Sequence, residues 1–153
     1  MPSWWGIHNN RPEIDFVDEG FVALGWDLIT TDARELTEDR DALKAELRRH
    51  YPHKNERAIG AWAGIFVRFV NDAAEGDIVV HPHKGEKTIN FGRIASPYEY
   101  AADEPTRRHR RRVTWLNTGV PRDAFTQETL WEVGSTLTFF GIKNHLDELR
   151  QWV

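Results

Sequence analysis

The chain has 153 residues, a formal net charge of −4, 40% hydrophobic residues and 29% charged residues, which are ordinary values for one globular domain. No stretch approaches the roughly 20 apolar residues that a membrane span requires, and the start lacks the basic and apolar regions of a secretory signal. The absence of cysteine excludes disulfides and thiolate metal sites. We therefore expect a soluble, cytoplasmic chain that forms one domain over residues 1–153.

The first half of the chain predicts two strands followed by two helices. Residues 4–8 and 21–26 are short apolar runs bounded by turn-forming residues, which is typical of strands. Residues 37–51 carry leucines four positions apart, as in an amphipathic helix. Asn55 is placed to cap a second helix that extends toward residue 76.

The second half predicts mostly strands. In chain order, we expect strands at 77–83, 88–94, 98–100 and 110–116, a short helix from Asp123 or Thr126, a strand at 137–140 and a terminal helix from Asn144. Strands and helices do not alternate regularly, so a doubly wound parallel sheet is disfavoured. The sequence predicts an α+β fold, with a curled mixed sheet or small barrel and flanking helices.

Basic residues are concentrated in the middle of the chain. Residues 1–76 hold 9 Lys and Arg against 14 Asp and Glu, whereas residues 77–122 hold 9 against 5. A dense run of arginines can neutralise phosphates through bidentate contacts. The candidate phosphate-binding residues are Arg107, Arg108, Arg110, Arg111, Arg112 and Lys84. An edge strand kept soluble by its charge is an equally good interpretation.

Aromatic side chains supply a candidate pocket for a planar base. A base flipped out of a duplex is read by stacking and by hydrogen bonds to its edge. The candidates are Trp4, Trp26, Trp62, Phe91 and Tyr98, with His81 and Asn90 as hydrogen-bonding neighbours. For any single ring, core packing is the more common role. Neighbouring Trp4 and Trp5 must face opposite sides of their strand, so one of them can be core while the other faces a pocket or solvent.

The sequence does not predict a catalytic site. His81 and His83 share a strand face and could be joined by His109 or His8, but nothing completes a set of metal ligands. Residues 85–87 place Glu directly beside Lys, without the acidic-x-Lys spacing of many nucleases. We expect no enzymatic activity, no metal and no cofactor.

An ordered series of segments resembles the amino-terminal domain of Mrr-type restriction proteins. The segments are WWGIHN at 4–9, GFVALGW at 20–26, EGDIVV at 75–80, NFGRI at 90–94, YEY at 98–100, RRRVTWL at 110–116 and VPRD at 120–123. This layout is similar to the PUA-like group that includes EVE and YTH domains. The resemblance implies a curled sheet that accepts a flipped, modified base into an aromatic cage beside a basic surface. It assigns a cage wall to Trp26, with Trp4, Phe91 and Tyr98 as further walls.

The predicted function is therefore a DNA-binding recognition module of a modification-dependent restriction or defence system, which reads a modified base such as a methylated one. The resemblance implies modified, double-stranded DNA as partner and a nuclease in a fused or separate domain, because the acidic-x-Lys motif of Mrr-type proteins is missing here. Three alternatives stay open, in this order. The first is an RNA-binding PUA-like domain, and the second is a small-molecule or protein-interaction domain in which the arginines form a solvated edge. The third is an enzyme with a metal centre at His81 and His83.

Overall fold

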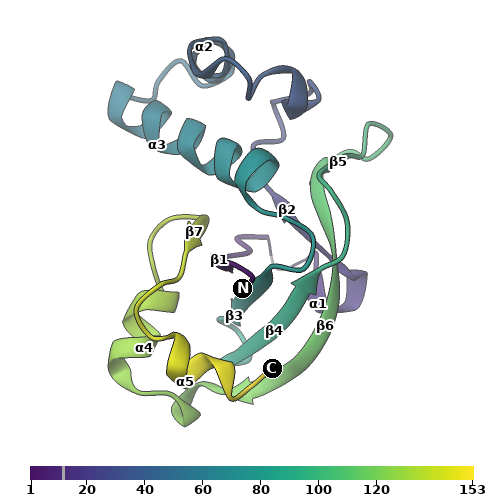
Figure 1. Cartoon of the computed structure of the whole chain (residues 1–153). Helices are drawn as coiled ribbons and strands as arrows, with labels where there is room; N and C mark the ends of the chain where they lie inside the picture. Colours follow the sequence, from purple (N-terminus) through teal and green to yellow (C-terminus); the bar gives the residue numbers. More distant parts are fainter. Residues whose placement is uncertain (12) are drawn as a thin grey trace.

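A curled, mixed β-sheet forms the centre of the computed structural model, which describes residues 1–11 and 13–153 (Figure 1). The strands are β1 Trp4–Ile7, β2 Phe21–Leu24, β3 Ile78–His83, β4 Thr88–Ile94, β5 Glu99–Tyr100, β6 His109–Pro121 and β7 Phe139–Gly141. The α-helices are α1 Phe16–Glu19, α2 Arg40–His50, α3 Glu56–Val67, α4 Gln127–Val133 and α5 Leu146–Arg150. Single helical turns of other types lie at Ala33–Glu35, Arg68–Asp72 and Arg122–Ala124.

The strand order is β2-β6-β4-β3-β1-β7, and β5 pairs with the first part of β6. Strands β1 and β3 are parallel, and the other pairs are antiparallel. The predicted α+β fold with a curled mixed sheet and flanking helices is thus confirmed.

The sheet curls where β4 pairs with β6. The pairing register shifts on either side of Phe91, as expected for a bulge, which bends a strand and increases its twist. A Cβ atom on Gly92 would clash with the side chains of Val113 and Trp115. Glycine is therefore required at this close approach of the two strands.

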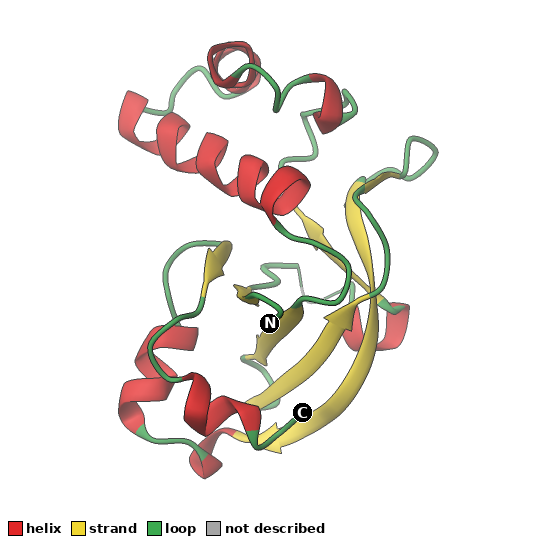
Figure 2. Cartoon of the chain, in the orientation of Figure 1, coloured by secondary structure: helices red, strands yellow, loops and turns green. Residues whose placement is uncertain are grey.

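Helices cover two parts of the sheet (Figure 2). Helices α2 and α3 enclose a core that includes Trp5, whereas α4 and α5 enclose a second core that includes Trp4. The two tryptophans therefore face opposite sides of β1, as strand alternation predicts. The two cores share one sheet. The loops that follow β1 and β2 form most of the candidate site described below.

The helix starts follow local capping rules. The Asn55 side chain accepts a hydrogen bond from the Ala58 amide, which confirms the predicted start of α3. Helix α1 was not predicted, because its four residues are too few to show a helical period. Asp15 caps its start, and Gly20, with a φ of 74°, ends it.

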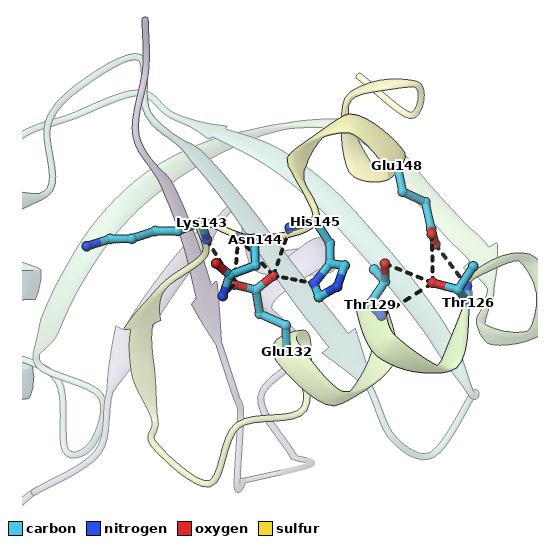
Figure 3. Close-up of polar contacts among 7 residues, drawn as sticks. All are labelled: Thr126, Thr129, Glu132, Lys143, Asn144, His145 and Glu148. Atoms are coloured by element: carbon cyan, nitrogen blue, oxygen red, sulfur yellow. Dashed lines mark hydrogen bonds and ion pairs between the residues drawn. The ribbon is translucent and has the colours of Figure 1, made fainter.

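Two carboxylates tie α4 to α5 (Figure 3). Glu132 of α4 accepts hydrogen bonds from the backbone amides of Lys143, Asn144 and His145, which precede α5. In return, Glu148 of α5 accepts bonds from the amide and hydroxyl of Thr126, which caps α4. A carboxylate on each helix thus accepts hydrogen bonds from donors at the start of the other helix, which would otherwise lack partners.

Candidate functional site

A pocket of about 360 Å³ lies between the loops that follow β1 and β2 and the residues that precede β6. Its lining residues are Asn10, Arg11, Gly25, Trp26, Asp27, Leu28, Tyr51, Arg107 and Thr138. This volume is at the lower end of the usual range for small-molecule sites, about 300–1,000 Å³. The lining combines aromatic rings with charged and amide groups, so it suits a planar, polar ligand.

Aromatic packing holds one wall of the pocket. The half-buried ring of Trp26 packs against Trp62 and Phe66 of α3, with ring centroids 5.5 Å and 5.3 Å away. Trp62 also packs edge-to-face on Tyr51, at 5.2 Å. The Tyr51 hydroxyl accepts a hydrogen bond from the Leu28 amide at 3.4 Å. Trp62 therefore supports the two aromatic residues that line the pocket.

The backbone of the pocket is strained at two positions. Trp26 has a φ of 50° and Arg107 a φ of 53°, in the left-handed region that costs a non-glycine residue on the order of 1–3 kcal/mol. Within the described residues, the one other non-glycine residue with positive φ is Lys87. Such strain concentrates at ligand sites, where the surrounding structure holds it in place.

Asp27 organises the charged side of the pocket. Its carboxylate accepts a 2.6 Å bond from the guanidinium of Arg11 and a 3.0 Å bond from the backbone amide of Arg107. Its carbonyl oxygen accepts a bond from the guanidinium of Arg108 at 3.2 Å. One carboxylate thus joins the loop after β1, the loop after β2 and the residues before β6.

A buried tyrosine–histidine pair anchors the segment that follows the pocket. The Tyr98 hydroxyl is 2.7 Å from Nδ1 of His109 and accepts a bond from the Ala33 amide. Burial lowers the pKa of His109 to about 4, so its ring is neutral near pH 7. Its Nε2 then donates to the carbonyl of Ile29 at 2.9 Å, and its Nδ1 accepts from Tyr98. Tyr98 is therefore a structural residue and does not line the pocket.

The other predicted pocket residues do not line this pocket. Trp4 and Phe91 are buried in the core under α4 and α5. Asn90 donates to the carbonyl of His81 and accepts from the Gly119 amide, which stabilises the irregular pairing of β4 with β6. His81 contacts the carbonyl of Ile7, and burial lowers its pKa to about 4.

The basic run does not form one phosphate-binding surface, because strand alternation divides it. Arg111 points inward, where its guanidinium donates to the carbonyls of Ser96, Phe69 and Ala73. Its neighbour Arg112 is exposed and pairs with Glu99.

The other arginines of the run have individual environments. Arg107 is buried, and Arg110 stacks on the ring of Phe21 with its guanidinium carbon 4.2 Å from the centroid. Arg108, Arg110 and Arg112 keep exposed surface, as does Lys84 in the turn after β3.

Sequence reasoning found Trp26 and Arg107 but missed Asn10, Arg11, Asp27, Tyr51 and Thr138. Asp27 carries a local signal, because it follows the Gly-Trp pair at the end of a strand, where turn residues commonly form binding sites. Tyr51 carries none, because it reaches the pocket through the packing of α2 and α3.

The described residues also bear on two other site types. No helix within residues 1–11 and 13–153 is both long and apolar enough to cross a membrane. Across that same part of the chain, no three histidine or carboxylate side chains are grouped as metal ligands.

A comparison with protein families matches residues 5–134 to one family model, described as "Domain of unknown function (DUF8426)". The chain belongs to this family. Within the DUF8426 chain, Thr138 is the pocket residue that falls outside the matched segment. No curated protein and no solved structure gives a significant match. The resemblance to Mrr-type and PUA-like domains therefore stays a prediction.

Proposed function

We propose that this chain is a recognition module of a modification-dependent restriction or defence system, and that its pocket accepts a modified base flipped out of double-stranded DNA. The observation that carries the proposal is the strained pair, Trp26 and Arg107, on the walls of an aromatic and polar pocket. Trp26 is also the residue to which the PUA-like resemblance assigns a cage wall.

The pocket offers the contacts that a flipped base requires. Trp26 and Tyr51 provide aromatic surface for stacking, and Asn10 and Thr138 add hydrogen-bonding groups. A methyl group in an apolar site yields roughly 1–3 kcal/mol of discrimination. A module with only this contact would prefer the methylated base by roughly 10- to 200-fold.

Arginines with exposed surface, which begin at the pocket and continue along β6, supply contacts to the DNA backbone. Arg108 reaches the carbonyl of Asp27 at the pocket itself, and Arg110 and Arg112 follow it along β6. Three phosphate contacts predict a slope of about −2.7 for the logarithm of affinity against the logarithm of salt concentration. Binding would weaken roughly 40-fold for a fourfold increase in salt.

The test is to titrate short duplexes that are unmodified or carry methylcytosine, hydroxymethylcytosine or methyladenine, at two salt concentrations. The proposal expects one modified duplex to bind best, with affinity that falls as salt rises. Competition with the matching RNA separates DNA from RNA recognition. Equal binding of all duplexes, or no binding, would refute the proposal. A nuclease is expected in a fused or separate domain.

A second candidate function is recognition of a free small molecule. It is favoured by the burial of Arg107 and Arg111, which removes two cations from the surface of a chain whose net charge is −4. This function predicts ligand binding in the same pocket without salt-dependent binding of duplexes.

A further inference from the structure

Arg107 is a buried cation that lacks a carboxylate partner. Its side chain lines the pocket, and the residue is only 3% exposed. Its Nη2 donates to the neutral amide oxygen of Asn9 at 2.9 Å. Within residues 1–11 and 13–153, its Nε has no hydrogen-bond partner and its guanidinium forms no ion pair. A buried charge is costly unless it is paired.

The neighbouring groups do not neutralise this charge. One carboxylate oxygen of Asp27 is bonded to the guanidinium of Arg11, and the other accepts the backbone amide of Arg107. The guanidinium of Arg108 binds the Asp27 carbonyl. Burial, and next the charge of Arg11, lowers the pKa of Arg107, but an arginine side chain stays protonated in proteins. Arg11 also forms an ion pair with Glu13 at 3.3 Å. The three arginines therefore outnumber the two carboxylates by one, which leaves an excess of one positive charge at the pocket.

The local backbone leaves room for this guanidinium. A Cβ atom on Gly25 would lie 3.2 Å from Nη1 of Arg107, closer than a normal contact. Arg107 itself has a φ of 53°. The lack of a side chain at Gly25 therefore leaves space for the guanidinium beside the pocket.

We propose that the pocket binds a whole nucleotide, with the ring stacked at Trp26 and the phosphate paired with the guanidinium of Arg107. Phosphate is the anion that a guanidinium binds best, through short, charge-assisted bonds. The inference rests on the proposed function for the base and adds an anion site to it. The nucleotide is either part of a strand or free, and the experiments below separate these sources.

The first experiment uses the unaltered protein and calorimetric titration with deoxyadenosine and deoxycytidine monophosphates, the matching nucleosides and inorganic phosphate. One charge-assisted contact corresponds to a difference of roughly 10- to 100-fold in affinity. A monophosphate is expected to bind more tightly than its nucleoside by this factor, and more tightly than inorganic phosphate. Equal affinity of nucleotide and nucleoside, or no binding of either, would overturn the anion site.

The second experiment assigns the preference to one side chain. Arg107→Met is expected to reduce nucleotide affinity to that of the nucleoside, whereas Arg93→Met, on the exposed face of β4, leaves both unchanged. Thermal unfolding checks that each variant folds. If Arg107→Met does not fold, Gly25→Ala provides a second test, because its Cβ crowds Nη1 and is expected to weaken nucleotide binding selectively. An unchanged preference in a folded variant would overturn the assignment.

The two proposals fail in different ways. Preferential binding of one modified duplex, without preference for nucleotide over nucleoside, overturns the anion site and leaves the proposed function standing. Preference for the nucleotide without binding of any duplex supports the anion site and refutes DNA recognition.

Discussion

Replacing Arg111 by methionine is expected to destabilise the protein strongly. Its guanidinium donates to the carbonyl of Ser96 at 3.2 and 3.1 Å and to that of Phe69 at 3.0 Å, and it also bonds the carbonyl of Ala73. Methionine leaves these three buried carbonyls without this donor. Each unsatisfied buried acceptor costs about 1–3 kcal/mol, so the free energy of unfolding should fall by at least about 3 kcal/mol. Urea unfolding followed by circular dichroism measures this change.

The neighbouring Arg112 provides a matched control. It is exposed and pairs with Glu99 across a 3.1 Å contact, and such surface pairs contribute roughly 0–1 kcal/mol. Arg112→Met should therefore change the free energy of unfolding by less than about 1 kcal/mol. Similar effects of the two substitutions would contradict the assignment of inner and outer arginines on β6.

Three further predictions concern stability. Gly6→Ala should lower the free energy of unfolding by more than about 2 kcal/mol, because its Cβ would overlap the ring of Phe140. Gly60→Ala in α3, where space is open, should raise it by about 0.5–1 kcal/mol. Thermal unfolding that ranks the two variants otherwise would contradict the packing. Glu132→Gln should cost about 1–2 kcal/mol in urea unfolding, because the backbone amides that precede α5 lose a charged acceptor, and an unchanged midpoint would refute this role. His81 and His109 have folded pKa values of about 4, below the unfolded value of about 6.5, so protonation favours the unfolded state. Their contribution to stability is complete above about pH 6.5 and is lost as the pH falls toward 4. Each histidine should contribute a loss of roughly 2 kcal/mol between pH 7 and 5, and unfolding curves that coincide at these pH values would exclude it.

The fold was predictable where the signal is local. Asn55 correctly predicted the start of α3. The strands predicted at 77–83 and 88–94 correspond to β3 and β4, which form the central hairpin. The extent of β6 was underestimated, because residues 117–121 are mostly polar or turn-forming and become a strand through pairing with β4. Helix α1 begins at the Asp15 cap and is too short to show a periodic pattern of apolar residues.

The site was predictable only in part. Trp26 was identified through the resemblance and lines the pocket, whereas Phe91 and Tyr98 were assigned to it but are core residues. A sequence shows that Arg111 and Arg112 face opposite sides of a strand, but not which side is the interior. Tyr51 reaches the pocket only because α2 and α3 pack together, and no local sequence pattern predicts that contact.

The most direct test of the central claim is to locate a bound modified duplex by nuclear magnetic resonance of the tryptophan indole groups. The chain has seven tryptophans, and Trp26→Phe assigns the indole signal of Trp26. Addition of the preferred duplex should shift this signal and leave that of exposed Trp131, on α4, in place. A shift at Trp131 with none at Trp26 would show that the nucleic acid binds elsewhere and would contradict base recognition in this pocket.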